Sequence, residues 1–285
     1  MLGAAFFFSV MSVLVKLATQ RLPPQEVVLA RGVISLALSW WMLRRAGIHP
    51  WGERKGFLWL RGLFGLLGLS LFYYALGNMP LPEANMLMQT NPAWTGLLAV
   101  FFLKERMSRT MIAGTTLSFG GIVLVTKPGV LFGGGEALPL LPAAAALGGA
   151  IVAAAAYVTV RHLRSSDHPL VIVFYFPLLA VPFSLAAHLF FPQVVGELVM
   201  PQGSDWLLLL GIGASTQAAQ LLLTRGLAEE NAGSAISIGY IQIVFAILWG
   251  VLLFREIPDA LALLGAGLVI AGTFSMALKK ATGRT

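Results

Sequence analysis

The chain has 285 residues, of which 58% are hydrophobic and 11% are charged, and it carries a net charge of +7 and no cysteine. Ordinary globular proteins have about 25% charged residues. So little charge cannot cover a water-facing surface, and the composition therefore excludes a soluble protein in favour of an all-α integral membrane protein. The absence of cysteine excludes disulfides and thiolate-bound metal. The basic residues are scattered over short loops, which favours membrane lipid, and no nucleic acid, as their partner.

Apolar segments follow one another along the whole chain, each near the length of about 20 residues that a helix needs to cross a bilayer. Short linkers with Pro and Gly separate many of them, as at residues 22–25, 79–82 and 127–135. The sequence therefore predicts ten transmembrane helices, at residues 2–19, 26–43, 57–77, 82–103, 110–126, 139–160, 169–191, 206–224, 232–254 and 258–278.

The loops between these spans divide sharply by charge. With the N-terminus in the cytoplasm, the inner segments hold thirteen basic residues and the outer loops hold three, Arg21, Lys127 and Arg255. An excess of Lys and Arg marks cytoplasmic loops. This count predicts that both termini lie in the cytoplasm, and the localisation that we expect is a bacterial inner membrane.

A short phrase occurs twice: VFFLKERMS at residues 100–108 and VLLFREIPD at 251–259, so that Glu105 and Glu256 are 151 residues apart. The same shift pairs Gly114 with Gly265, and a shift of 145 pairs Lys16 with Arg161. Self-similarity at a fixed period indicates an internal repeat. Because each copy has an odd number of spans, the second must enter the membrane upside down. The predicted fold is thus two inverted five-helix repeats, residues 1–130 and 136–280, an arrangement typical of alternating-access transporters.

Two stretches carry a resemblance to a known family. Residues 61–125 open with an Arg, pass through YYAL, an NP break and FLKER, and end in a span with two glycines seven residues apart; residues 231–272 repeat much of this pattern. Both resemble the EamA family of the drug/metabolite transporter superfamily, and the chain looks most like its bacterial YddG-type exporters of aromatic and other apolar amino acids. The second copy departs from the first where Ile243 replaces the proline of NPAW.

All twelve carboxylates lie at or near the ends of the predicted spans. Carriers coupled to protons or sodium often place an acid at membrane depth despite its cost. The pattern therefore favours a facilitator over a proton-coupled carrier. Glu26 and Glu83 remain as coupling candidates, although an acid in the first turn of a helix is also favoured simply by the helix dipole.

Polar side chains in spans three, four, eight and nine recur at helical spacing, which places them on common faces. Buried amides in lipid need partners, which either a solute or a neighbouring helix can supply. Taken together, their clustering favours a substrate cavity lined by Tyr73, Tyr74, Asn85, Gln89, Asn91, Trp94, Gln217, Gln220, Ser237, Tyr240 and Gln242.

Four positions are predicted to break helices or brace gates. Pro92 removes a backbone donor in span four, and Gly239 weakens span nine. Lys16 and Arg161 end spans one and six on opposite sides of the membrane, where each is expected to brace a gate.

Two arginines, Arg31 and Arg61, also lie within predicted spans. Each is about five residues from a span end, where snorkelling to the interface explains a long cationic side chain. On this interpretation no mid-span pair of cations is available, and a polyanionic substrate is not expected.

The sequence shows no enzyme motif: it lacks H-E-x-x-H, and Gly133–Gly135 precede no Lys-Ser/Thr pair. His162, Asp167 and His168 are interpreted as solvated loop residues, so neither a metal nor another cofactor is expected. The predicted function is export of small amphipathic metabolites, above all apolar amino acids, by a functional monomer that can form a weak homodimer. Export of another metabolite or a cationic drug, with proton coupling, is one alternative, and a non-transporting membrane scaffold or receptor is another.

Overall fold

The architecture comes from a computed structural model that describes residues 2–91, 93–95, 97–98, 109–126, 138–163, 166–229 and 242–282. Within these ranges every regular element is helical. The long helices are α1 (Leu2–Ala18), α2 (Pro24–Arg45), α3 (Lys55–Asn78), α6 (Arg109–Thr126), α8 (Leu140–Leu163), α9 (Pro169–Phe190), α11 (Ser204–Glu229) and α13 (Ala260–Thr282). The short helices are α4 (Leu81–Met88) and α10 (Pro192–Val195), and the helix Gln242–Phe254 ends in the π-turn η1 (Gly250–Phe254).

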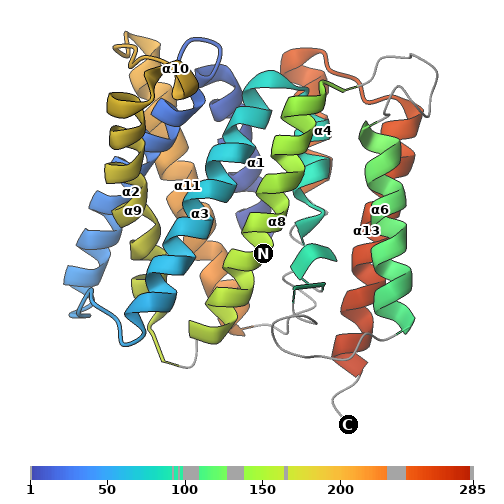
Figure 1. Ribbon diagram of the computed structural model, residues 1–285, viewed down its shortest axis with the longest axis horizontal. Helices are drawn as coiled ribbons and strands as arrows, with labels where there is room; N and C mark the ends of the chain where they lie inside the picture. The colour runs from blue at the N-terminus through green and yellow to red at the C-terminus, as the bar shows by residue number, and fades with distance from the viewer. Residues whose placement is uncertain are drawn as a thin grey trace.

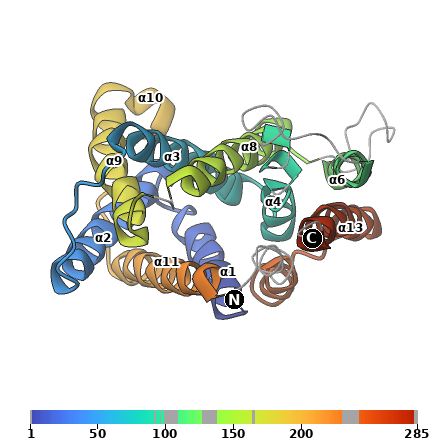
Figure 2. The same cartoon turned by 90° about the horizontal axis from the view of Figure 1, so that it is seen from below.

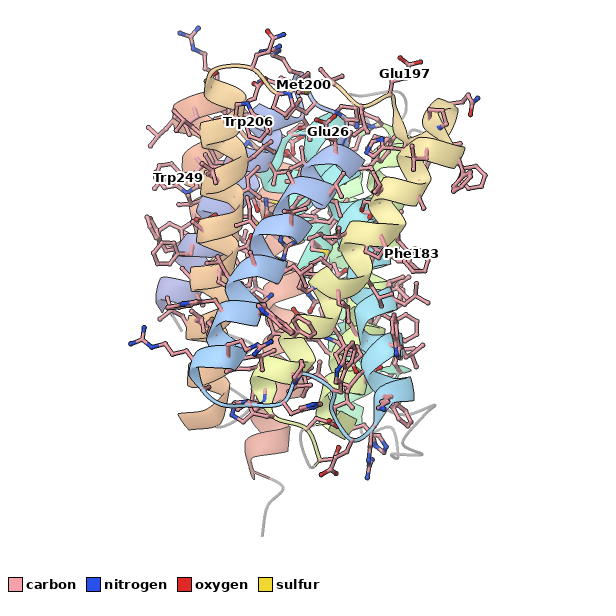
Figure 3. All side chains as sticks on the ribbon, turned by 90° about the vertical axis from the view of Figure 1, so that its left-hand side faces the viewer. Glu26, Phe183, Glu197, Met200, Trp206 and Trp249 are labelled. Atoms are coloured by element: carbon pink, nitrogen blue, oxygen red, sulfur yellow. The ribbon has the colours of Figure 1, made fainter. Side chains whose placement is uncertain are left out.

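Apolar length matches the expectation of a membrane-embedded bundle. Four helices, α2, α3, α8 and α9, are long and apolar enough by length and composition to cross a membrane, and shorter apolar helices accompany them. Large apolar side chains face outward on these helices; Phe183, labelled in Figure 3, is 52% exposed. A surface of this kind suits lipid rather than water.

The helices pack in specific pairs. Helix α3 lies against α8, α1 against α11, α2 against α9, and α6 against α13. Viewed from below the bundle, α6 and α13 stand together at one edge of the molecule, away from α2 and α9 (Figure 2). This position agrees with the expectation that spans five and ten pack at the periphery.

The α6–α13 pair is closed by backbone contact at two glycines. A Cβ on Gly265 would lie 2.7 Å from the carbonyl oxygen of Gly121, and a Cβ on Gly121 would lie 2.5 Å from the carbonyl oxygen of Gly265. Small residues allow membrane helices to approach this closely. These two glycines therefore have a structural role, which is to let α6 and α13 cross closely.

Helix α9 begins at Pro169, capped by the His168 side chain, which accepts from the backbone N–H of Leu170 at 3.2 Å. Its interior contains Pro177 and Pro182. Each proline lacks the backbone N–H that would bond to the carbonyl four residues before it. The helix nonetheless continues to Phe190, packed against α2 and α3.

Candidate functional site

One end of the bundle is tied together by Lys16, at the last turn of α1. Its Nζ lies 2.6 Å from Oε1 of Glu256 and donates to the carbonyl of Met79 at 2.9 Å. The second carboxylate oxygen of Glu256 accepts from the backbone N–H of Leu81 at 2.8 Å. We call these groups the Lys16–Glu256 tie. It joins α1, the turn between α3 and α4, and the segment after η1, and α13 (Ala260–Thr282) ends at the opposite end of the bundle (Figure 1).

The turn after η1 explains how Glu256 reaches Lys16. Arg255 adopts a left-handed conformation, with φ 56°, and is the only non-glycine residue in the described ranges with positive φ. This conformation costs a non-glycine residue about 1–3 kcal/mol and persists where surrounding contacts hold it. The Glu256 N–H then bonds to the carbonyl of Gly250 at 3.0 Å, which turns its side chain back over the helix end.

A buried cluster of amides lies next to the tie. The Nε2 of Gln242 donates to Oδ1 of Asn85 at 3.2 Å, and the Nε2 of Gln89 donates to Oε1 of Gln242 at 3.0 Å. Ser12 on α1 reaches the same Asn85 oxygen at 3.4 Å, and Asn85 Nδ2 donates to the carbonyl of Leu81 at 2.9 Å. The structure thus brings together three of the predicted cavity residues, and in this conformation they bond to one another.

Two other predicted cavity residues contact their own helix or a neighbour. The indole N–H of Trp94 donates to Thr90 Oγ1 at 3.2 Å, and its ring meets Phe119 of α6 edge-on at 4.8 Å. Asn91 is 9% exposed, and its carbonyl accepts from Thr95. Trp94 therefore packs towards α6 rather than joining the amide cluster.

The polar residues of α11 and the end of α3 lie apart from that cluster. Gln217 is 7% exposed, and its Nε2 lies 3.4 Å from the sulfur of Met42. Gln220 and Tyr74 are half-buried, and the Tyr74 carbonyl accepts from Asn78. No single group in the described structure contains all the predicted cavity residues.

Five predicted site positions lie wholly or partly outside the described residues. Pro92, Ser237, Gly239 and Tyr240 lie outside the described residues, as does the side chain of Arg161, whose backbone belongs to α8. Their assigned roles stay predictions.

The expectation that Arg31 snorkels is wrong. Arg31 is only 5% exposed, and its guanidinium lies over the rings of Phe176 at 5.0 Å and Tyr73 at 5.8 Å, with Nη1 3.4 Å from the Tyr73 hydroxyl. Its Nε has no hydrogen-bond partner in the described part of the chain. Thr216 of α11 faces the Tyr73 hydroxyl, but its Oγ1 forms no hydrogen bond of good geometry within the described residues. Aromatic side chains hold this cation inside the bundle, at a depth of about 10 Å, seven residues into α2.

Arg61 also points inward instead of snorkelling. Its Nη1 lies 2.5 Å from the position of a Cβ on Gly65, one turn deeper in α3, whereas the nearer water lies back towards Lys55. Helical side chains normally lean towards the helix N-terminus, so this direction requires the space that Gly65 leaves. The Arg61 Nε is buried and has no hydrogen-bond partner in the described residues.

These two arginines are the inward-pointing polar residues that sequence reasoning missed. Distance from a span end was taken as sufficient for snorkelling, although a side chain near an end can turn either way. The available signal was Gly65, which follows Arg61 by one helical turn and gives its guanidinium room to fold inward.

The loop interpretation of Asp167 also needs correction. Asp167 is 5% exposed and accepts from the backbone N–H of Glu53 at 2.7 Å and from Ser166 at 2.8 Å. Nearby, Arg54 lies 2.8 Å from His162. Asp167 therefore fastens the loop after α8 to the loop before α3 instead of lying free in solvent.

At the same end of the bundle as the Lys16–Glu256 tie, Glu26 supports the loop between α10 and α11. Glu26 is 6% exposed, and its Oε2 accepts from the backbone N–H of Val199 at 2.9 Å. Figure 3 places it beneath the stretch that carries Met200, near Trp206. Residues of α2, α11 and this loop line an apolar cavity of about 290 Å³ beside it. The contacts of Glu26 are those of a residue that holds a loop in place.

Comparison with known proteins relates most of the chain to membrane transporters. The model of the EamA-like transporter family matches residues 1–127 and 140–278. The chain is 33% identical to the pseudopaline exporter CntI of Pseudomonas aeruginosa, over 97% of this chain and 94% of the exporter. It is 30% identical to human solute carrier family 35 member G1, over 97% and 77%, and 26% identical to the riboflavin transporter of Vibrio cholerae, over 95% and 89%. One solved structure shares the fold, with a TM-score of 0.67 at 20% identity over 99% of each chain.

Proposed function

Because the chain belongs to the EamA-like transporter family, we propose that this multi-pass membrane transporter exports small amphipathic metabolites, above all amino acids with aromatic and other apolar side chains. The proposed mechanism is alternating access between two inverted five-helix halves, residues 1–130 and 136–280, in the manner of a YddG-type exporter.

The observation that carries the mechanism is the pattern of helix pairs. The third helix of the first half, α3, packs on the first helix of the second half, α8; the third helix of the second half, α11, packs on the first helix of the first half, α1. The remaining pairs, α2 with α9 and α6 with α13, join equivalent helices. Exchange of the two halves leaves this set of pairs unchanged, as a pseudo-two-fold axis requires. Related halves of this kind can rock around a site between them.

The Lys16–Glu256 tie supports a state that is closed at one end. It connects α1 of the first half with the segment before α13 of the second half. The distribution of basic residues supports placing this end outside and both termini in the cytoplasm, and the proposed location is a bacterial inner membrane. Export then requires the tie to open in each cycle.

The residues in the interior support an amphipathic substrate, and they support transport driven by the gradient of that solute. Among the described residues, apolar side chains outnumber polar ones such as Asn85, Gln89 and Gln242 in the interior, which suits a solute with an apolar body and a small polar end. All carboxylates lie at or near span ends, and Glu26 is engaged with a backbone N–H. The carrier is therefore proposed to be a facilitator that follows the solute gradient. Each chain holds both halves, so a monomer is proposed to be sufficient for transport, with a homodimer possible but not required.

The test is counterflow in proteoliposomes with radiolabelled Phe, Met and Thr, beside nucleosides and cationic drugs, with and without an imposed pH gradient. We expect exchange of the apolar amino acids at a rate that the gradient leaves unchanged. Concentrative uptake driven by the gradient would replace the facilitator with a proton-coupled carrier. Transport of no solute would favour a scaffold or receptor.

A second candidate is export of pseudopaline or a related metabolite, which the similarity to the Pseudomonas exporter along nearly the full chain favours. Pseudopaline belongs in the same panel. If the protein transports pseudopaline but no amino acid, pseudopaline export replaces amino-acid export as its function.

A further inference from the structure

Two cations inside the bundle are the starting point. Arg31 of α2 is 5% exposed between Phe176 and Tyr73, and Arg61 of α3 turns inward beside Gly65. Arg61 is half-buried, and its Nη1 and a ring carbon of Phe176 lie 2.5 and 2.9 Å from the same point, the position of a Cβ on Gly65. The Phe176 ring therefore lies close to both guanidinium groups, which come from neighbouring helices.

Within the described residues, no ion pair gives either arginine a negative partner. The ion pairs within the described residues are Lys16–Glu256 and Arg21–Asp205, and neither includes Arg31 or Arg61. Elsewhere in the sequence every carboxylate lies at or near a span end. Like charges in a medium of low dielectric repel strongly, and buried cations are normally paired. An anion from outside the chain would reduce the repulsion between the two arginines and give each of them a partner of opposite charge.

The free hydrogen-bond donors point to the geometry of that anion. Both Nε atoms are buried without partners in the described structure, although a structural arginine normally uses its donors on neighbouring acceptors. A guanidinium presents paired N–H groups that match the two oxygens of a carboxylate.

We propose that Arg31 and Arg61 bind the carboxylate of the transported solute, with the rings of Phe176 and Tyr73 against its apolar part. This inference rests on the proposed function and narrows it: the substrates are organic acids, including amino acids, and cationic drugs are excluded by the positive charge of the site. A solute that lacks the carboxylate leaves the two arginines unpaired and binds weakly.

Binding is tested in detergent by thermal shift, without transport. The probes are matched carboxylates and amides, L-phenylalanine with L-phenylalaninamide, L-leucine with L-leucinamide and 3-phenylpropionate with its amide, together with pseudopaline. We expect the acids to stabilise the wild type and the amides to leave it unchanged. In Arg31→Gln and in Arg61→Gln, apparent affinity for the acids falls about 10- to 100-fold, the range expected for a lost charge-assisted hydrogen bond.

Two further variants separate this role from folding. Arg31→Lys keeps the charge without the paired donors and should retain part of the preference for acid over amide. Arg54→Gln removes a cation from the loop before α3 and should behave as wild type. Gel filtration checks that each variant is monodisperse, and the readout is the acid-to-amide affinity ratio, which a merely structural arginine would not alter.

The outcomes distinguish the two proposals. If amino acids are transported but the ratio is the same in wild type, Arg31→Gln and Arg61→Gln, the arginine site is refuted and the proposed function stands. If no probe acid stabilises the wild type, the arginine site is likewise refuted. Stabilisation by acids that depends on both arginines, in a protein that transports no amino acid, would keep the site and overturn amino-acid export.

Discussion

Neutralising Glu256 should loosen the closed end of the transporter. In the Lys16–Glu256 tie, one carboxylate oxygen lies 2.6 Å from Lys16 Nζ and the other accepts from Leu81 N–H at 2.8 Å. Glu256→Gln keeps an oxygen acceptor and the size of the side chain but removes the charge. The variant should therefore shift the population towards the state that is open at this end, without preventing folding.

The size of the shift follows from the two contacts. Hydrogen bonds to charged groups contribute about 1.5–3 kcal/mol and neutral ones about 0.5–1.5 kcal/mol, so loss of charge costs roughly 1–2 kcal/mol. The side chains of Lys16 and Glu256 are 13% and 23% exposed, so solvent screens the pair only partly. Since about 1.4 kcal/mol corresponds to a factor of ten, the open population should rise about 5- to 30-fold.

The assay uses the absence of native cysteine. A single Ser12→Cys places a thiol one turn before Lys16, at a position that is 0% exposed and lies beside Asn85. Modification by a membrane-impermeant thiol reagent then reports opening, because its rate is proportional to the open population while that population is small. We expect the rate to rise by the same factor in Glu256→Gln.

The matched control is Arg21→Gln, which removes the other ion pair at this end. Arg21 lies 3.1 Å from Asp205, but its side chain is 53% exposed, and exposed pairs contribute about 0–1 kcal/mol. Its effect on the rate should stay below about fivefold. A rate in Glu256→Gln within twofold of the parent would refute the idea that the tie holds this end closed.

Two further predictions concern packing and the amide cluster. Gly265→Ala should lower stability by about 1–3 kcal/mol because its Cβ would meet the backbone of α6, whereas Gly267→Ala, with open space around it, should be neutral or slightly stabilising; thermal unfolding in detergent compares them, and equal effects would contradict the close crossing. Gln242→Leu removes the partner of both Asn85 and Gln89 and should cost about 1–2 kcal/mol. Combined with Gln89→Leu its effect should be less than additive, and strict additivity in the same unfolding assay would show that the two amides are not coupled.

The sequence alone predicts a structural feature correctly where a single physical rule determines that feature. Hydrophobic length placed the ends of helices such as α3 and α9 within two residues, and Gly265 was expected at a close helix crossing. Amide chemistry selected Asn85 and Gln242 as buried and interacting. Which side chains would meet was harder to predict, because partners depend on helix rotation. Arg31 shows this limit: its distance from the span end was compatible with snorkelling, and only its neighbours Phe176 and Tyr73 show that it stays inside.

The two prolines of α9 give the bundle an unequal distribution of stiffness. Pro177 follows directly after Phe176, the ring that covers Arg31, and Pro182 lies just over one turn later. Each leaves one rung of the helical ladder unbonded, so bending here breaks fewer hydrogen bonds than bending α2 or α3, which have no proline in their interiors. The part of the bundle that bends most easily therefore lies next to Arg31 and Arg61. A swing of the N-terminal half of α9 about this segment would draw Phe176 off the guanidinium while α2 and α3 stay straight.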